Sequence, residues 1–273
     1  MTLPDVPALA ASVLARIAAE LGAPPPALPA ADLETLAAAC QGDANKLKRW
    51  IKRRLAGEPI PYILGEIVFR ERRFRIDPRA YITDPESSFL VDGVETAVDA
   101  FTAKHGRPPL VAEIGSGCGS LAISLKLERP AATVIALDLD PAALRLSVEN
   151  AAAHRADVRF VESDLFDAWP EAAAPDLIFA DPPWGSEETL YSEERDGNYY
   201  RAMPAASAFP LGGLTGVHAQ ILRSVAQRQW SSHVILNGGV LPQAELEAVA
   251  RGAHWYAITA SGWGVSLLHC RMR

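Results

Sequence analysis

The sequence has little of what marks secreted, membrane-spanning or metal-binding proteins. Its 273 residues include three cysteines, Cys40, Cys118 and Cys270, an odd number at wide spacings that indicates neither a disulfide framework nor a zinc knuckle. No run of about 20 apolar residues occurs, and the first residues, Met-Thr-Leu-Pro-Asp, lack the basic and apolar segments of a signal peptide. We therefore predict a cytoplasmic protein with no membrane span and no metal site.

Positive charge is also scarce. Lysine and arginine number 26 against 33 acids, a net charge of -7, which argues against general binding to nucleic acid phosphates. One basic run, Lys-Leu-Lys-Arg-Trp-Ile-Lys-Arg-Arg at residues 46–54, is either a solvated helix face or a contact with an acidic partner. Apolar residues make up 49%, enough to bury a sizeable core.

The periodicity changes twice along the chain. Residues 1–60 predict a small helical bundle, with Leu9, Val13, Ile17 and Leu21 spaced four apart in its first helix. Residues 61–82 predict a β-hairpin linker, with apolar and charged residues alternating near Phe69. From residue 83 strands and helices alternate, with strands expected at 110–114, 133–138, 158–161, 176–180 and 233–236 and a closing pair at 255–259 and 264–270. Such alternation predicts a doubly wound α/β sheet that binds ligands at the carboxyl ends of its strands.

A glycine-rich turn follows the first of these strands. Residues 113–119 read Glu-Ile-Gly-Ser-Gly-Cys-Gly, with Gly115, Gly117 and Gly119 at alternate positions. Glycines let the backbone approach a ligand closely and permit positive φ. The spacing differs from the dinucleotide fingerprint, and an acid, Glu113, precedes the first glycine.

Two further acids stand where the next strands end. Asp138 lies about 20 residues beyond the turn, where a carboxylate accepts hydrogen bonds from ribose hydroxyls. Ser163, Asp164 and Leu165 follow the third strand, where carboxylate and backbone can read the amino edge of adenine. Together with the glycine turn, these positions predict a bound adenosyl group.

The fourth strand ends in Asp181-Pro182-Pro183-Trp184. Two prolines remove two backbone donors and leave a corner rich in acceptors. The Asp181 carboxylate and the Pro182 carbonyl can each accept a hydrogen bond from one planar N–H2 group, and Trp184 offers a flat face to a planar or cationic substrate. We predict that this corner directs a nitrogen toward a methyl sulfonium, with positioning as the main source of rate.

These motifs resemble the class I S-adenosylmethionine-dependent methyltransferases, and specifically the HemK/PrmC family, which methylates a glutamine of peptide-chain release factors. The resemblance rests on residues 57–65, the glycine turn, Asp138, Asp164 and the proline pair. It implies a seven-stranded, Rossmann-like methyltransferase domain over residues 83–273, a substrate-recruiting helical head and S-adenosyl-L-methionine as cofactor. By the same resemblance Glu113, Gly115, Gly117, Cys118, Gly119, Asp138, Asp164, Leu165 and Asp181 hold the cofactor.

The departures from that family bear on the methyl acceptor. The family has asparagine and tyrosine where this chain has Asp181 and Trp184, and an acid where this chain has Asn237. An aspartate only accepts hydrogen bonds, which suits a group that presents donors alone, such as a guanidinium or an exocyclic amine. Acids at Glu86, Glu187 and Glu188 are further predicted to bind or attract such a cation.

The sequence thus favours N-methylation of a guanidino or amino small molecule such as free arginine, in specialised metabolism, by Asp181, Pro182 and Trp184. The alternative acceptor is the release-factor glutamine, which retention of the whole head supports. A third possibility, from a different functional class, is a non-catalytic binding module that keeps the fold. The intact glycine turn and its acids argue against that module.

Overall fold

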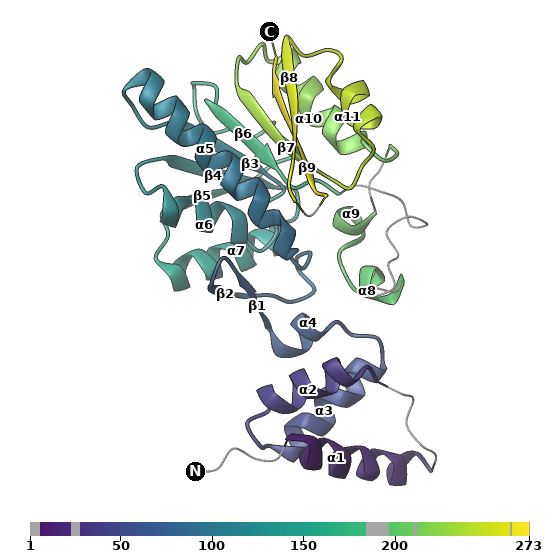
Figure 1. Ribbon diagram of the computed structural model, residues 1–273. Coiled ribbons are helices and arrows are strands. Elements are labelled where there is room, and N and C mark those ends of the chain that lie inside the picture. Colours follow the sequence, from purple (N-terminus) through teal and green to yellow (C-terminus); the bar gives the residue numbers. More distant parts are fainter. Residues whose placement is uncertain (1–5, 23–27, 184–196, 210–211, 263, 273) are drawn as a thin grey trace.

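A seven-stranded sheet forms the centre of the larger part of the molecule (Figure 1). The structure is a computed structural model that describes residues 6–22, 28–183, 197–209, 212–262 and 264–272. Its strands are β3 (Leu110–Ile114), β4 (Thr133–Asp138), β5 (Val158–Glu162), β6 (Leu177–Ala180), β7 (His233–Gly239), β8 (Trp255–Ala260) and β9 (Ser266–Arg271). Their order is β5-β4-β3-β6-β7-β9-β8, with β9 antiparallel to both neighbours, so the predicted closing pair is confirmed.

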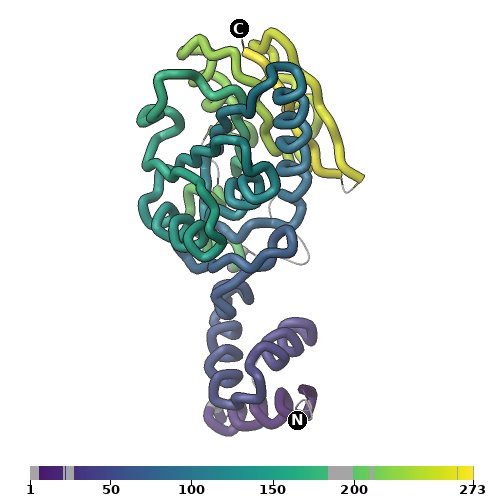
Figure 2. Tube along the Cα trace, turned by 90° about the vertical axis from the view of Figure 1, so that its left-hand side faces the viewer, coloured from purple at the N-terminus to yellow at the C-terminus, as the bar shows by residue number. Residues whose placement is uncertain are grey.

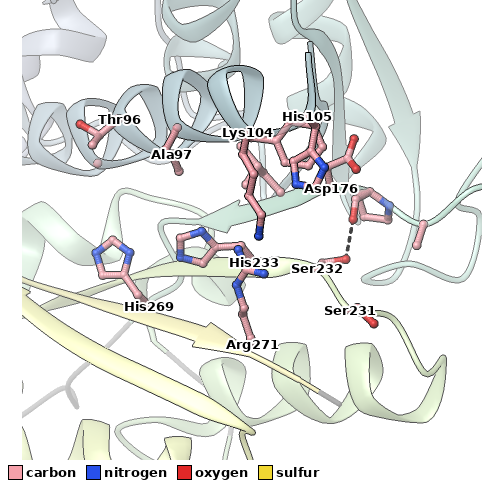
Figure 3. Close-up of a pocket in the computed structure, with 16 residues that line it drawn as sticks. Thr96, Ala97, Lys104, His105, Asp176, Ser231, Ser232, His233, His269 and Arg271 are labelled. Atoms are coloured by element: carbon pink, nitrogen blue, oxygen red, sulfur yellow. Dashed lines mark hydrogen bonds between the residues drawn. The ribbon is translucent and has the colours of Figure 1, made fainter. Parts of the chain in front are cut away.

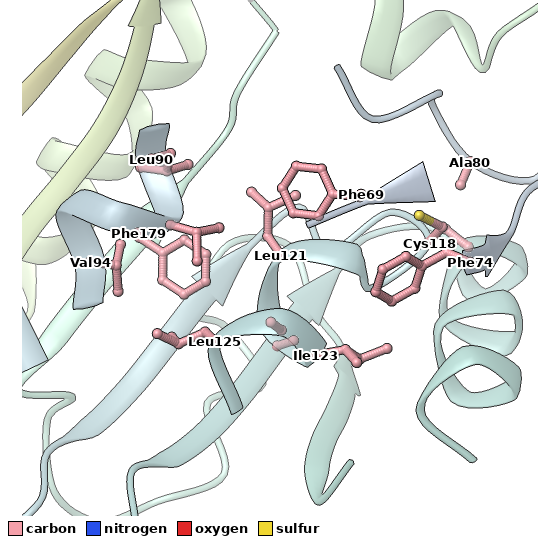
Figure 4. Close-up of a cluster of buried hydrophobic side chains, with 14 of the residues drawn as sticks. Phe69, Phe74, Ala80, Leu90, Val94, Cys118, Leu121, Ile123, Leu125 and Phe179 are labelled. Atoms are coloured by element: carbon pink, nitrogen blue, oxygen red, sulfur yellow. The ribbon is translucent and has the colours of Figure 1, made fainter. Parts of the chain in front are cut away.

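Helices cover both faces of this sheet. Alternate residues of one strand point to opposite faces, so Leu177 and Phe179 join one apolar cluster while Ile178 joins another. The first face carries α5 (Ser88–His105), α6 (Ser120–Glu128) and α7 (Pro141–His154), and Figure 4 shows its core. The second face carries α10 (Gly216–Gln227) and α11 (Gln243–Ala250). The predicted doubly wound α/β fold is confirmed.

The chain order reverses between β3 and β6. From β3 the chain moves outward to β4 and β5, then returns to the other side of β3 as β6. Ile114 and Ala180 pair at the carboxyl ends of these two strands. Open α/β sheets bind ligands in the crevice at such a switch point. The glycine turn after β3 and the Asp181 corner after β6 therefore lie next to each other at this switch point.

The amino-terminal helices pack around a core of their own. They are α1 (Val6–Leu21), α2 (Ala30–Ala39) and α3 (Ala44–Leu55), and Val13, Ile17 and Ile51 are fully buried among them. This head stands apart from the sheet in two views (Figures 1 and 2). The basic run of α3 is partly neutralised within the chain, by the ion pairs Lys48–Glu20, Lys52–Glu20, Arg53–Glu58 and Arg54–Asp32.

A short helix and a hairpin join the head to the sheet. The helix α4 (Ile60–Leu64) places Ile63 in the head core and Tyr62 in the core beneath the sheet. The Tyr62 hydroxyl donates to the Ala80 carbonyl at 2.6 Å. The hairpin, β1 (Glu66–Phe69) and β2 (Arg72–Arg75), turns at Arg70 and Glu71, both in the left-handed region.

Three short elements complete the described chain: η1 (Pro85–Ser87), α8 (Gly197–Arg201) and α9 (Ala205–Ala208). Together with α4 they are too short for sequence periodicity to predict. Among the described residues, none of the helices has the length and apolarity needed to cross a membrane. Within those same residues, no cluster of histidine, cysteine and acids has the makings of a metal site.

Candidate active site

The glycine turn is held in shape from the neighbouring strand. The amides of Gly115 and Ser116 both donate to the Leu137 carbonyl at the end of β4, at 2.8 and 3.1 Å. Gly115, Gly117 and Gly119 all have positive φ, between 53° and 83°. The turn thus needs glycine for its backbone path alone, because L-residues rarely adopt these angles.

The three glycines differ in what surrounds them. A Cβ on Gly119 would lie 2.9 Å from the Ser147 Cβ and 3.3 Å from the Phe160 ring, so α7 and β5 pack directly against it. A Cβ on Gly115 or Gly117 would meet nothing within 4 Å. Protein packing therefore explains the last glycine, while the first two border open space of the kind that a ligand occupies.

Glu113 lies beneath this turn with only 1% of its surface exposed. Its Oε2 atom has no hydrogen-bond partner in the described part of the chain. Burial raises its pKa well above the usual carboxyl range, and the charges of Asp138 and Asp181 raise it further. Two other carboxylates thus lie close enough to raise the pKa of Glu113, and one of the Glu113 oxygens lacks a donor, an arrangement that a cationic ligand would stabilise.

Asp138 ends β4 beside the turn. Its Oδ2 accepts from the Gly117 amide at 2.8 Å and its Oδ1 from the Asp140 amide at 2.9 Å. Burial raises the pKa of Asp138 although these two donors act in the opposite direction. The next residue, Leu139, is 63% exposed, a large apolar side chain at the mouth of the site.

The predicted purine-reading loop follows β5. Ser163 is buried and its hydroxyl accepts from the Ala168 amide at 2.9 Å. Asp164 is exposed, and Leu165 is half-buried with φ at 46°. The Ser163 amide donates to the Asp138 carbonyl at 2.9 Å, which ties this loop to the acid that ends β4.

Asp181 is held by one donor on each oxygen. Asn237 Nδ2, from β7, donates to Asp181 Oδ1 at 2.7 Å, and the Ser87 hydroxyl, from η1, donates to Oδ2. Burial raises the pKa of Asp181, while both hydrogen bonds lower it. A carboxylate oxygen has about two lone-pair sites, so acceptor capacity remains on each oxygen. Pro182, which is buried and has no N–H, follows directly.

A second layer of contacts orients Asn237. Its Oδ1 accepts from the Gly239 amide at 2.9 Å, so Nδ2 faces Asp181. The fully buried His218 contacts the Asn237 carbonyl through Nε2 at 2.8 Å. Burial lowers the pKa of His218, which keeps the ring neutral near pH 7 with its proton on Nε2. The sequence did not predict Ser87, Asn237 or His218 as site residues. It marked Asn237 only as a position that differs from the resembling family.

The remaining predicted site residues are Cys118, Glu86, Trp184, Glu187 and Glu188. The Cys118 side chain is buried in the core, with its Sγ 3.6 Å from the Thr83 hydroxyl oxygen. Cys118 could therefore contact a ligand only through its backbone. Glu86 is exposed on η1 and close enough for its charge to raise the pKa of Asp181. Trp184, Glu187 and Glu188 lie outside the described residues.

Comparison with protein families gives a match to a methyltransferase domain. The family model of the Methyltransferase small domain matches residues 83–193. Residues 83–193 are thus similar to a methyltransferase domain. The predicted enzyme class is thus that of the matched domain, and the resemblance drawn from the sequence motifs is confirmed by relatives named for release-factor glutamine methylation.

Two curated relatives represent two kinds of acceptor. The release factor glutamine methyltransferase of Neisseria gonorrhoeae is 39% identical over 141 residues, 51% of this chain and 49% of that protein. The 4-amino-L-phenylalanine/4-methylamino-L-phenylalanine methyltransferase of Streptomyces pristinaespiralis is 32% identical over 136 residues, 50% of this chain and 46% of that protein. The chain spans about half the length of the curated relatives it matches.

A solved structure supports the fold. The Thermus thermophilus 16S rRNA N2 G1207 methyltransferase, in complex with AdoMet and guanosine, aligns with a TM-score of 0.53 at 18% identity. The alignment covers 76% of this chain and 50% of that one. The predicted cofactor, S-adenosylmethionine, is that of the matched family. The site also fits it, since Glu113 has an unpartnered buried oxygen and Gly115 and Gly117 border open space.

Proposed function

We propose that the protein is an S-adenosylmethionine-dependent N-methyltransferase. The observation that carries the proposal is the placement of Asp181 at the carboxyl end of β6, next to the glycine turn of β3. A half-buried acid with spare acceptor sites there, followed by a residue with no N–H, suits a nitrogen that donates hydrogen bonds.

Residues on the β3 side of the switch point would hold the cofactor. Glu113 suits a cationic group, because its buried carboxyl has an unpartnered oxygen. Asp138 would accept from ribose, and Asp164 and Leu165 would meet the purine. When bound, S-adenosylmethionine supplies a methyl group activated by a positively charged sulfur.

The β6 side would hold the acceptor. Asp181 and the Pro182 carbonyl accept hydrogen bonds from the two N–H groups of one nitrogen and fix its orientation, which is a large part of catalysis for a bimolecular displacement. Trp184 would add a flat face, and Glu187 and Glu188 negative charge. The acceptor nitrogen releases a proton as it forms the new bond, and Asp181, whose pKa burial raises, can hold that proton.

A glutamine side chain of a release factor is the acceptor that the relatives favour. Several relatives at 30–39% identity are named release factor glutamine methyltransferases. The chain has an independent helical head with a core of its own, and a protein substrate gives such a head a use. The cytoplasm, where release factors act, is the matching compartment, and the -7 net charge supports a protein rather than a nucleic acid as partner.

A small amino or guanidino compound is the second candidate, favoured by Asp181 itself. Asparagine can serve both the donor and the acceptor of a glutamine amide, whereas a carboxylate serves donors alone. Exocyclic amines and guanidinium groups present donors to it, and the charge of the carboxylate about doubles the strength of such bonds. One relative is named for methylation of an aromatic amine of an amino acid. Free arginine and 4-aminophenylalanine are the compounds to offer.

One experiment separates these acceptors. Purified protein receives methyl-labelled cofactor with release factor, free arginine or 4-aminophenylalanine in parallel, and products are identified by mass. Labelled release factor with both small molecules untouched would support the first candidate, and the reverse pattern the second. Cofactor binding without transfer to any of the three would contradict both and favour a non-catalytic binding module.

A further inference from the structure

A cavity lies at the opposite end of β6 from Asp181. Its volume is about 570 Å³, and it is lined by the carboxyl-terminal half of α5, the start of β7 and the end of β9. β6 and β7 both begin at this cavity, at Leu177 and His233, and end at the candidate active site. The volume is in the range of small-molecule sites, and none of the predicted site residues lines it.

Nitrogen-bearing side chains from separate elements, two of them cationic, meet in this cavity (Figure 3). Lys104 extends from α5 toward His233 of β7 and Arg271 of β9. His233 and Arg271 pair across the sheet, and the His233 and His269 rings lie 5.5 Å apart between centroids. No acid of the described chain forms an ion pair with Lys104 or Arg271. The one carboxylate in the lining, Asp176, is engaged by Arg107 at 2.8 and 2.9 Å.

His233 adds an unused polar atom. Its Nε2 is buried and has no hydrogen-bond partner among the described residues. Burial, together with the charges of His269 and Arg271, lowers the pKa of His233 to about 4. The other titratable group of the lining, His105, stacks on Phe101 at 4.3 Å between ring centroids. An anion in the cavity would offset this positive surplus and give His233 Nε2 a partner.

The opposite wall is apolar. Gly93, Ala97, Ala100 and Phe101 of α5 line it. Lys104, in the last turn of α5, also complements the negative end of that helix. Helix electrostatics do not account for His233 and Arg271, which come from strands. The lining therefore combines an apolar wall with a cation from β9, Arg271, and an unpartnered imidazole from β7, His233.

We propose that this cavity binds a small organic oxyanion, with Lys104, Arg271 and His233 on its phosphate or carboxylate group and its apolar body against α5. The site is separate from the proposed active site. Its test needs no methyltransferase activity.

The test measures binding of phenyl phosphate, benzoate and neutral benzyl alcohol by calorimetry, with histidine NMR signals followed in parallel. We expect an anion to bind and to raise the pKa of His233 above about 4. The Lys104→Ala/Arg271→Ala double variant should lose affinity by about tenfold or more, since truncating charges that contact a ligand has effects of this order. Both side chains are exposed, so the variant should fold.

Arg145→Ala, an exposed arginine on α7, is the matched control and should bind as the parent does. Stronger binding of phenyl phosphate identifies a phosphate ester as the ligand class, and stronger binding of benzoate a carboxylate. Three results would each overturn the proposal: benzyl alcohol binds as well as the anions, the double variant keeps its affinity, or neither anion binds at about 10 mM. Only the weakest specific sites need a ligand concentration that high.

Discussion

Two neutral donors hold the Asp181 carboxylate. Asn237 contacts one oxygen and Ser87 the other, from elements on either side of β6. The resembling family has an amide at the corner and an acid after the fifth strand, and here the two chemical types have changed places. The pair still joins one donor to one acceptor, at 2.7 Å. The negative charge has moved to the residue that faces the proposed acceptor nitrogen.

Asn237→Ala should therefore act through Asp181. Loss of one hydrogen bond to a charged group costs about 1.5–3 kcal/mol, so kcat should fall by about 10- to 100-fold. The bond from Asn237 lowers the pKa of Asp181, so its removal should raise that pKa and shift the acidic limb of the kcat/KM profile to higher pH. Cofactor affinity should stay unchanged in titrations. An equal loss of cofactor affinity would mean that Asn237 has a general structural role.

Asp181→Asn should separate the two proposed acceptors. A neutral side chain loses the charge-assisted bond to an amine or guanidinium nitrogen, so turnover of that acceptor should fall by about 100-fold. Asparagine can both donate to and accept from the amide of glutamine, so turnover of a glutamine acceptor should change by less than about tenfold. The acidic limb should also flatten, because activity that needs ionised Asp181 rises with pH through its raised pKa. A parent-like pH profile in the variant would contradict this account.

Glu113→Gln should stabilise the protein free of cofactor. The folded-state pKa lies above the unfolded-state pKa, so the unfolding free energy falls as pH rises from the ordinary carboxyl pKa through the folded value. Removing the buried charge should add about 1–3 kcal/mol at pH 8, and less at pH 4, where the carboxyl is protonated. Thermal melts at both pH values measure this, with exposed Asp157→Asn as control. Equal gains at both pH values would exclude a charge effect.

At the scale of one element, alanine at Gly119 and alanine at Gly117 of the glycine turn should have different effects. Gly119→Ala places a methyl group 2.9 Å from Ser147 of α7, so overpacking of about 1–3 kcal/mol adds to backbone strain. Gly117→Ala meets only the backbone strain, about 1–2 kcal/mol, but its methyl group would enter the space assigned to the cofactor. We expect Gly119→Ala to lower the melting temperature more and Gly117→Ala to lower cofactor affinity more. The reverse order would remove the distinction drawn between these glycines.

Local patterns predicted the elements better than the contacts between them. Apolar strands and the glycine turn have signals within a few residues, so the sheet and its switch point could be predicted. Ser87 and Asn237 contact Asp181 across 94 and 56 positions of the chain, and no local pattern encodes such a meeting. Lys104, His233 and Arg271 of the proposed anion-binding cavity likewise come from three separate elements, α5, β7 and β9. The helix α4 has only five residues, too few for a periodicity.

At the scale of the whole molecule, α4 and the hairpin set where the head stands. Arg70, in the hairpin turn, contacts Glu128 of α6 and Asp92 and Glu95 of α5. Arg72 also contacts Glu128. These ion pairs fix the hairpin on the methyltransferase domain, while Ile63 of α4 packs into the head. The head therefore has its own core and a defined attachment to the sheet domain.

Ile51→Ala tests this division. Ile51 is fully buried in the head core, and truncation of a buried isoleucine costs about 2–5 kcal/mol. Amide exchange should rise across α1–α3 and stay unchanged in β3, β4 and β6, because the sheet has separate cores. Cofactor affinity should be preserved. If a release factor is the acceptor, its methylation should fall sharply, while any small amine would be methylated at the parental rate.

Ile123→Ala provides the matched control, since Ile123 is equally buried but lies in α6, beneath the glycine turn. It should weaken cofactor binding and raise exchange in the sheet while leaving the head protected. If Ile51→Ala lowered cofactor affinity as much as Ile123→Ala does, the head and the sheet would unfold together. The head would then support the fold of the active site, and its core would be no argument for a protein substrate.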